Sequence, residues 1–211
     1  QVRNEYRLAP LRRCAFAGKS YEADGAKLKR QLNGFFTSNE GPDFKPSENA
    51  GKLIKGLVVP TYDLKQAGPV YAWAYKELQE AVQPDVYVII GSAYSGLANL
   101  FAVTDKDFET PLGVVRTDQT IVSQIRDRFP ESFEEDVCHE AEHAVEFQLP
   151  FLQQVVGDKR LFTIVPILCS FSALDLSDQA VRHSIEGFLG GLREIMAGCG
   201  RSYCVIGAGE L

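Results

Sequence analysis

The sequence predicts an α/β fold: a three-layer sandwich in which helices cover both faces of a mainly parallel central sheet, with a hairpin added at one edge. Two patterns predict it. Four short apolar runs rich in Val and Ile each stop at Gly, Pro or a small polar residue, as strands buried on both faces do. Segments with helical periodicity separate these runs, and strands that alternate with helices form parallel sheets.

The predicted strands are short, and each is followed by residues that favour a turn. They cover residues 53–59, 86–90, 161–168 and 202–206. Their turns begin at Pro60, Gly91, Cys169 and Gly207. Residues 101–115 do not fit this alternation, and we expect them to form the edge hairpin, with its turn around residues 105–107.

Four helices are predicted from apolar side chains that recur every three or four residues. Each follows a residue that favours a helix N-terminus, and these residues are Asp24, Pro69, Asp118 and Ser177. Trp73 and Tyr75 of the second predicted helix are interpreted as core aromatics. Gly198 is the stop signal of the last helix.

The composition indicates one ordinary globular domain over residues 1–211, with 45% hydrophobic residues and a formal charge of −6. No basic run exceeds the pair Arg12-Arg13, which argues against nucleic acid or an anionic membrane as a partner. No apolar run reaches the roughly 18 residues of a membrane span. Five scattered cysteines indicate free thiols in a reducing compartment, so we expect a cytoplasmic protein.

In an open α/β sheet, ligands bind outside the carboxyl ends of the strands. The loops that follow the predicted strands should therefore line any site. These loops carry hydroxyl and charged side chains and no histidine, namely Thr61, Tyr62, Asp63, Lys65, Ser92, Tyr94, Ser95, Ser170 and Glu210.

The three histidines of the chain are His139, His143 and His183. His183 lies in the last predicted helix and is interpreted as a solvated or half-buried residue. His139 and His143 fit the pattern H-E-x-x-H, which on a helix places two imidazoles on one face, with Glu140 as the general base of a zinc peptidase. No third ligand follows at a suitable spacing and Pro150 interrupts the helix, so a surface cluster or a role in another site stays open.

The segment EHAVEFQLPFL, residues 142–152, carries a resemblance to a known family together with six further segments. These are, in family order, CAFAGKSYEA (14–23), PTYDLKQAGPVYAWAY (60–75), GSAYSG (91–96), TPLGVVRTD (110–118), IVPILC (164–169) and VIGAGEL (205–211). With them the chain resembles the Memo family, the B component of the AmmeMemoRadiSam system. That family is similar in fold to class III extradiol ring-cleaving dioxygenases.

Members of that family bind a divalent metal through a histidine after the first Pro and another after the Gly of the second strand. The corresponding residues here are Thr61 and Tyr94, whose hydroxyls do not replace imidazole nitrogens. The family's third ligand, a cysteine, and the histidine of its Asp-Leu-x-His motif would lie beyond Leu211, since Glu210-Leu211 align with Asp-Leu. The resemblance thus implies a chain truncated at its C-terminus, and we predict no metal or other cofactor.

The leading hypothesis is a Memo-like pseudoenzyme, a non-catalytic binding protein that recognises a protein partner or a small molecule in the strand-end cleft. We expect it to act as a homo-oligomer or as a subunit of a larger complex. The cleft residues at or near the family's metal positions are Thr61, Tyr94, Asp63, Ser92 and Glu210.

Glu142 and His143 are the candidate catalytic residues. His143 acts either as a general base that Glu142 orients or as a packed residue that holds its segment down. The second hypothesis is a metal-dependent enzyme whose substitute ligands come from beyond residue 211 or from Tyr94, Asp63, His143 and Glu210. A zinc peptidase that uses His139 and His143 is the third hypothesis.

Overall fold

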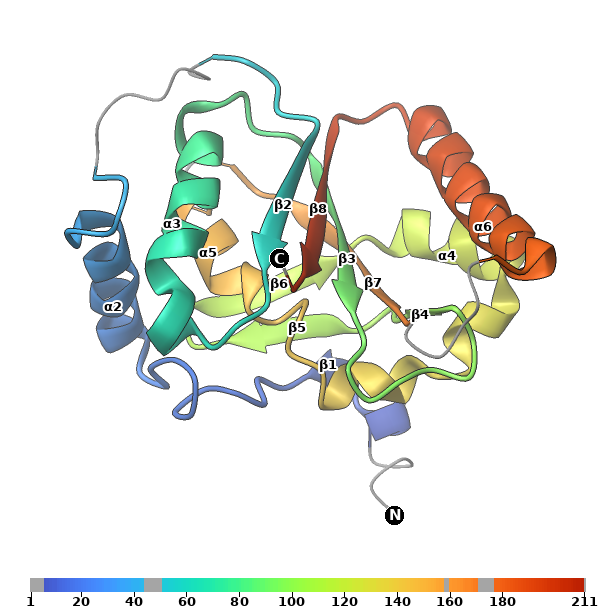
Figure 1. Ribbon diagram of the computed structural model, residues 1–211, viewed down its shortest axis with the longest axis horizontal. Coiled ribbons are helices and arrows are strands. Elements are labelled where there is room, and N and C mark those ends of the chain that lie inside the picture. The colour runs from blue at the N-terminus through green and yellow to red at the C-terminus, as the bar shows by residue number, and fades with distance from the viewer. Residues whose placement is uncertain (1–5, 44–50, 158–159, 171–176, 211) are drawn as a thin grey trace.

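The computed structural model describes residues 6–43, 51–157, 160–170 and 177–210 (Figure 1). Within them the strands form one sheet in the order β1-β5-β6-β7-β3-β8-β2, and β4 pairs with β7 beside this path. The strands are β1 (Leu11–Arg12), β2 (Gly56–Pro60), β3 (Val86–Ser92), β4 (Phe101–Val103), β5 (Asp107–Thr110), β6 (Gly113–Thr117), β7 (Thr163–Cys169) and β8 (Tyr203–Gly209). All neighbouring pairs are parallel except β4 with β7 and β5 with β6.

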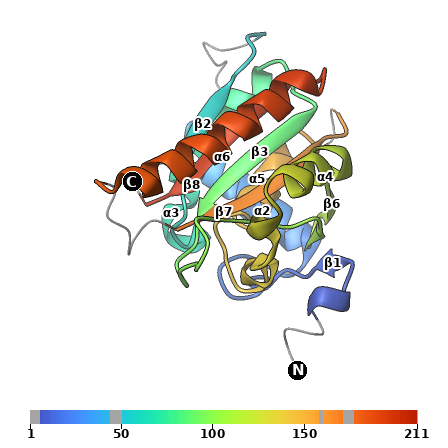
Figure 2. The ribbon, with the colours of Figure 1, turned by 90° about the vertical axis from the view of Figure 1, so that its right-hand side faces the viewer.

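Helices cover both faces of this sheet. They are α2 (Gly25–Thr37), α3 (Leu64–Glu80), α4 (Gln119–Arg128), α5 (Gln148–Val155) and α6 (Gln179–Gly198), with the 3-10 helices η1 (Pro130–Phe133) and η2 (Asp136–Glu140). Helices α2, α3 and α5 lie on one face, and α4 and α6 lie on the other (Figures 1 and 2). The predicted α/β sandwich is thereby confirmed. None of the described helices is long and apolar enough to cross a membrane.

The central strands are apolar on both faces because successive side chains point into opposite cores. In β3, Tyr87 and Ile89 pack in the core that α2, α3 and α5 share, whereas Val86 and Val88 pack in the core that α4 and α6 share. The four predicted strands are confirmed as β2, β3, β7 and β8. Strands β3, β7 and β8 extend past the predicted ends, and β2 starts later, at Gly56.

The predicted edge hairpin exists, but its turn is at Pro111-Leu112 and not around residues 105–107. Strands β5 and β6 form the hairpin, while β4 pairs separately with β7. The hydroxyl of Thr110 donates to the carbonyl of Gly113 at 3.0 Å, and Gly113 takes a φ of 119°, which favours glycine. The sequence TPLG has neither of the Asn-Gly or Asp-Gly pairs that signal a tight hairpin, so the position of the turn was not predictable.

Two helices begin at residues other than the predicted ones. Asp63 caps α3 by accepting from the backbone N–H of Lys65 at 2.8 Å, so the helix starts before Pro69 and includes it. Asp178, and not Ser177, caps α6. In both cases a nearby aspartate accepts from a free N–H group of the first turn, and this cap outweighs the preference of Pro69 or Ser177 for a helix start.

Trp73 is not a core residue. Its side chain is 54% exposed, and the indole N–H donates to the carbonyl of Glu40 at 2.8 Å. Tyr71, Tyr75 and Leu78 form the buried stripe of α3 at the helical spacing, and Trp73 lies off that stripe. The prediction for Tyr75 is confirmed.

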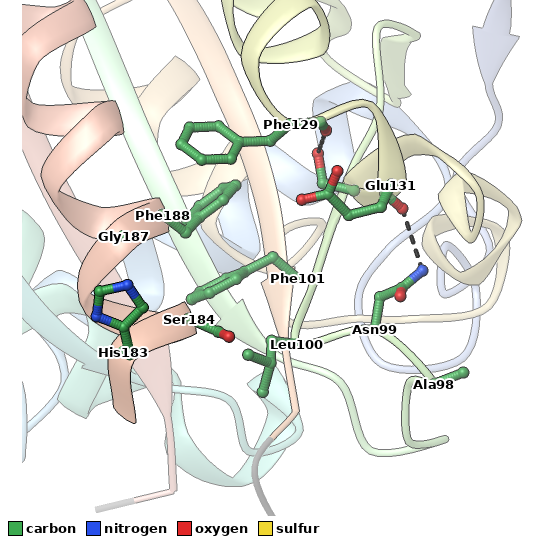
Figure 3. A pocket seen from close by; sticks show the side chains of 11 residues that line it. Ala98, Asn99, Leu100, Phe101, Phe129, Glu131, His183, Ser184, Gly187 and Phe188 are labelled. Atoms are coloured by element: carbon green, nitrogen blue, oxygen red, sulfur yellow. Dashed lines mark hydrogen bonds between the residues drawn. The ribbon is translucent and has the colours of Figure 1, made fainter. Parts of the chain in front are cut away.

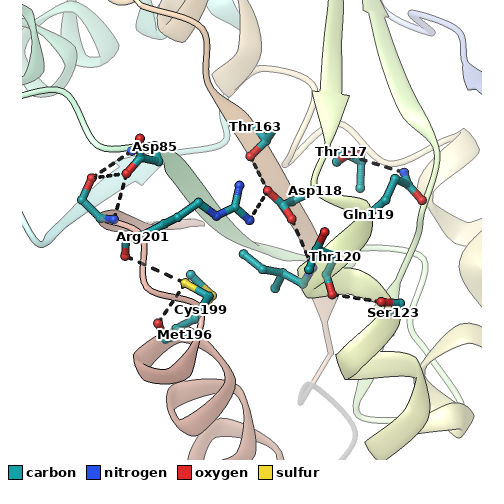
Figure 4. A network of polar contacts seen from close by, with 12 residues as sticks. Asp85, Thr117, Asp118, Gln119, Thr120, Ser123, Thr163, Met196, Cys199 and Arg201 are labelled. Atoms are coloured by element: carbon teal, nitrogen blue, oxygen red, sulfur yellow. Dashed lines mark hydrogen bonds and ion pairs between the residues drawn. The ribbon is translucent and has the colours of Figure 1, made fainter.

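A polar network ties the amino ends of the strands together (Figure 4). The carboxylate of Asp118 caps α4, accepts from the Thr163 hydroxyl at 2.6 Å and pairs with Arg201 at 2.6 Å. Asp85 accepts from the backbone N–H of Ser202 at 3.0 Å and from its hydroxyl at 2.7 Å. These contacts join the starts of β3, β7 and β8.

Strand β2 lies at one border of the sheet. It pairs with β8 on one side, and no described strand pairs with its other side. The side chain of Val58, in the middle of β2, is 67% exposed.

Candidate functional site

The carboxyl ends of β2, β8 and β3 lie side by side, so the loops that follow these strands meet (Figure 1). The last residue of β2, Pro60, pairs with Gly209 at the end of β8. Thr61 and Glu210 are the next residues after these two strand ends, so the chain leaves the sheet side by side at these two positions. This is the edge of the sheet at which the parallel topology predicts ligand binding.

The hydroxyls of Thr61 and Tyr94 form a hydrogen bond with each other. Thr61 is only 2% exposed, whereas Tyr94, in the loop after β3, is 45% exposed. The two positions that the resemblance aligns with metal-binding histidines are thus adjacent in space. The bond joins the loops after β2 and β3 and uses both hydroxyl groups.

His143 lies in the same place, although it does not follow a strand. Its imidazole stacks on the Tyr94 ring with 4.9 Å between ring centroids and 19° between ring planes. Phe16 meets the imidazole edge-on at 5.6 Å, and Phe147 lies against it at 4.9 Å. None of the strand-end loop residues predicted from the sequence is a histidine, and the structure adds His143 to them.

Glu142 is buried and holds the loop that carries Tyr94. Its Oε1 accepts from the backbone N–H of Ser95 at 2.8 Å and from the Ser95 hydroxyl at 2.6 Å. Glu142 thus contacts Ser95, and its neighbour His143 contacts Tyr94, the residue before Ser95 in the same loop. This arrangement fixes the orientation of the Tyr94 ring relative to the strand ends.

The other strand-end residues have different surroundings. Asp63 is half-buried and caps α3, so its carboxylate is engaged with backbone. The hydroxyl of Ser92 lies beside Gly209, 3.3 Å from where a Cβ of that glycine would stand. Glu210 and Tyr62 are exposed, and Tyr62 shows 51% of its surface.

The electrostatic environment of Tyr94 is acidic. Burial raises the pKa of its phenol, and the carboxylates of Glu210 and Glu142 raise it further, against the opposing effect of the Thr61 hydrogen bond. The phenol therefore stays protonated at neutral pH. Tyr62 and Tyr94 are both exposed at this edge, and His143 covers one face of the Tyr94 ring.

His139 has no part in this edge of the sheet. It is buried, its Nε2 lies 3.0 Å from the carbonyl of Ala102, and its ring meets Phe108 edge-on at 6.1 Å. Burial lowers the pKa of His139 to about 3, so the imidazole is neutral. His139 and His143 thus point into different surroundings.

The H-E-x-x-H segment is not on one helix. The 3-10 helix η2 ends at Glu140, and α5 does not begin until Gln148. Pro150 therefore lies in the first turn of α5, where its missing N–H costs nothing, instead of interrupting a helix that carries both histidines. Among the described residues no group of three His, Cys, Asp or Glu side chains is placed to hold a metal ion.

A buried ion pair holds the segment that carries Glu142 and His143. Arg12 pairs with Glu146, and both side chains are fully buried. The Arg12 guanidinium also donates to the carbonyls of His139 at 2.8 Å and of Glu142 at 2.9 Å. Glu146 accepts from the backbone N–H of Phe16 at 3.0 Å, which places the phenylalanine ring beside His143.

Neither Arg12 nor Glu146 was predicted from the sequence as part of this arrangement. The available signal was a glutamate inside the apolar segment AVEFQLPFL, because a buried carboxylate requires a cation or several donors. Tyr21 also donates to Glu146, and burial together with this carboxylate raises the pKa of the Tyr21 phenol.

Comparisons with known proteins agree with the resemblance in the sequence. Residues 12–188 match the family model described as Memo-like protein. A MEMO1 family protein of Ignicoccus hospitalis is 34% identical over 201 residues, which cover 93% of this chain and 67% of that protein.

Two further relatives give similar values. A MEMO1 family protein of Saccharolobus islandicus is 35% identical over 168 residues, covering 78% of this chain and 58% of its own length. Another, of Methanopyrus kandleri, is 35% identical over 155 residues and is covered over 54% of its length. The chain thus spans from about half to two thirds of the curated relatives that it matches.

Proposed function

Because the chain belongs to the Memo family, we propose that it is a non-catalytic binding protein of that family, which holds a positively charged group of a partner against the tyrosines and carboxylates at the strand ends. The observation that carries this proposal is the hydrogen bond between the Thr61 and Tyr94 hydroxyls at the positions that resemble the family's metal-binding histidines.

The donors at these positions do not fit the divalent metal that the resemblance implies. A borderline divalent metal takes imidazole nitrogens or thiolates, and a neutral hydroxyl is a poor substitute. Tyr94 would have to lose its proton to become a good ligand, and burial and two carboxylates raise its pKa. The two hydroxyls also hydrogen-bond to each other, so one lone pair of the accepting oxygen is already occupied.

The same side chains suit a cation of a partner. A lysine, arginine or small amine on an exposed tyrosine face gains about 0.5–2 kcal/mol, depending on how far it is desolvated. Tyr62 and Tyr94 are exposed, and Glu210 supplies an exposed carboxylate beside Tyr94. The formal charge of −6 adds long-range attraction for a basic partner.

The proposal is tested first by the metal content of the purified protein. We expect iron, copper and zinc well below one equivalent, with no change in Tyr94→Phe or His143→Ala. One equivalent of metal that either substitution removes would overturn the proposal and support an enzyme with substitute ligands.

Binding is tested by calorimetry with a peptide of alternating lysine and glycine, against the same peptide with glutamate. We expect binding of the lysine peptide only, at least about fivefold weaker in Tyr94→Leu and little changed in Tyr94→Phe, which keeps the ring. Trp73→Leu, which removes an exposed aromatic from α3, is the matched control and should leave binding unchanged. Equal binding of both peptides would contradict the proposal.

A further inference from the structure

A cavity of about 430 Å³ opens between β4, η1 and α6 (Figure 3). Its volume lies in the range of about 300–1,000 Å³ that is usual for small-molecule sites. Thr61, Tyr94 and His143 are not among the residues that line it, so it is a separate site from the strand-end residues.

Three phenylalanines form the apolar wall of the cavity. Phe101 of β4 and Phe188 of α6 stack with 4.0 Å between ring centroids and 12° between ring planes. Phe129, at the end of α4, lies against Phe188 at 5.0 Å with its ring tilted by 51°. Figure 3 shows the three rings together. Phe101 and Phe188 are almost fully buried, so the half-buried Phe129 is the ring of the wall that is most open to a ligand.

Two polar side chains at the rim have no hydrogen bond to any described residue, and both are exposed. They are the carboxylate of Glu131 and the imidazole of His183, on opposite sides of the phenylalanines in Figure 3. The other rim groups are engaged: the Ser184 hydroxyl donates to the carbonyl of Ala180 at 3.0 Å, and the amide of Asn99 donates to the carbonyl of Glu131 at 3.1 Å.

Glu131 is the one acidic side chain among the residues that line the cavity. The nearby cation, Arg128, lies 5.6 Å from the Phe129 ring centroid and pairs with Glu194 at 2.7 Å. Glu135 accepts from the backbone N–H groups of Ala98 and Asn99, which fixes the loop on that side of the cavity. A carboxylate next to an aromatic wall selects a ligand that combines an apolar ring with a protonated nitrogen.

We propose that this cavity binds a small aromatic amine, with the ring against the phenylalanine wall, chiefly Phe129, and the ammonium group on Glu131. His183 accepts or donates a second hydrogen bond at the opposite rim. The proposal goes beyond the strand-end function and does not depend on it.

Two glycines of α6 offer a matched pair of variants. A Cβ at Gly187 or at Gly190 would meet no atom within 4 Å, so a side chain can start at either position without a clash. Only Gly187 lines the cavity. Gly187→Leu therefore fills the cavity, whereas Gly190→Leu makes the same chemical change on the same helix outside it.

The experiment is an NMR titration of the full chain with tryptamine and, separately, with indole-3-propionate, which carries the opposite charge. We expect tryptamine to shift the signals of the cavity residues and to bind at least about tenfold more tightly than the acid. Gly187→Leu should abolish this binding and Gly190→Leu should retain it. Glu131→Gln should remove the preference for the amine.

The proposal is overturned if tryptamine causes no shifts at millimolar concentration, if Gly187→Leu binds as well as Gly190→Leu, or if the acid binds as tightly as the amine. Thermal unfolding of the two glycine variants shows whether both are folded. A failure here leaves the strand-end proposal intact, because Tyr94 and its neighbours are not changed in any of these variants.

Discussion

The hydroxyl of Thr61 is buried, and the phenol of Tyr94 is its hydrogen-bond partner. Tyr94→Phe leaves that hydroxyl without this partner, so we expect a loss of about 1–2 kcal/mol in the free energy of unfolding. Thr61→Val in the same background should restore part of the loss, because it removes the unsatisfied group. Urea unfolding of the single and double variants measures both effects, and strictly additive losses would contradict the coupling.

Because the imidazole of His139 is buried, we expect the free energy of unfolding to depend on pH. Burial lowers the pKa of its imidazole to about 3 in the folded protein, below the ordinary 6.5. As the pH falls, the unfolded chain therefore binds a proton at His139 before the folded protein does. The stability that neutral His139 contributes is present above about pH 6.5 and is lost as the pH falls toward 3. The slope of the unfolding free energy approaches about 1.4 kcal/mol per pH unit in this window.

His139→Gln removes this titration. Urea midpoints of the two proteins at pH 7, 6 and 5 should converge as the pH falls, although the variant starts out less stable. Parallel curves would show that the imidazole is not kept neutral by burial.

Some residue contacts were predictable and others were not. The adjacency of Thr61 and Tyr94 follows from parallel strands whose carboxyl ends share one edge of the sheet. The stacking of His143 on Tyr94 joins a loop to a segment almost fifty positions further along the chain, and no local pattern encodes that distance. Whether these residues bind a cation stays a prediction.

At the scale of secondary structure, the cap of α4 does more than begin a helix. Asp118 accepts from the backbone N–H of Ile121 and from Thr163, and it pairs with Arg201, so it also joins the starts of β7 and β8. Burial alone would raise the pKa of Asp118, but these hydrogen bonds and the guanidinium outweigh it and lower the pKa below the ordinary 3.8.

Asp118→Ala is expected to cost about 1–2 kcal/mol or more, because a cap and an ion-pair partner are lost together. Because the folded pKa is lowered, the contribution of the charge is present above about pH 4 and is lost as the pH falls through the folded value. Asp118→Asn should therefore lose less stability than the native chain between pH 5 and 2. Acid unfolding followed by circular dichroism measures this, and identical acid transitions would contradict it.

The elements differ in how well the sequence predicts them. The start of α2 was predictable because Asp24 precedes a clear apolar repeat and does accept from Lys27. The path of the chain between η2 and α5 was not predictable. Its H-E-x-x-H spacing is typical of a helix, but Arg12 donates to the carbonyls of His139 and Glu142, and the segment is not one helix. A contact from a distant part of the chain overrides the local preference there.

At the scale of the whole molecule, Arg12 joins the first strand of the sheet to the segment that carries His143. Arg12→Met leaves Glu146 buried without its cation, and we expect a loss of about 3–5 kcal/mol in the free energy of unfolding. Arg13→Met changes an exposed neighbour and should cost no more than about 0.5 kcal/mol. Chemical denaturation measures both.

If Arg12→Met does not fold, Arg12→Lys keeps the charge but loses the fork of donors, and it should still be clearly less stable than the native chain. Native stability in Arg12→Lys would show that the guanidinium contacts to His139 and Glu142 contribute little. The overall fold itself was predictable from buried strands that alternate with helices, whereas this link across the molecule was not.

The border strand β2 has one hydrogen-bonded neighbour in the described chain, and Val58 in it faces water. Backbone N–H and C=O groups along such a margin can accept another β-strand. Relatives such as the Ignicoccus hospitalis protein possess roughly half as much polypeptide again as the stretch aligned here. A further strand beside β2 would leave the pairing of every described strand unchanged.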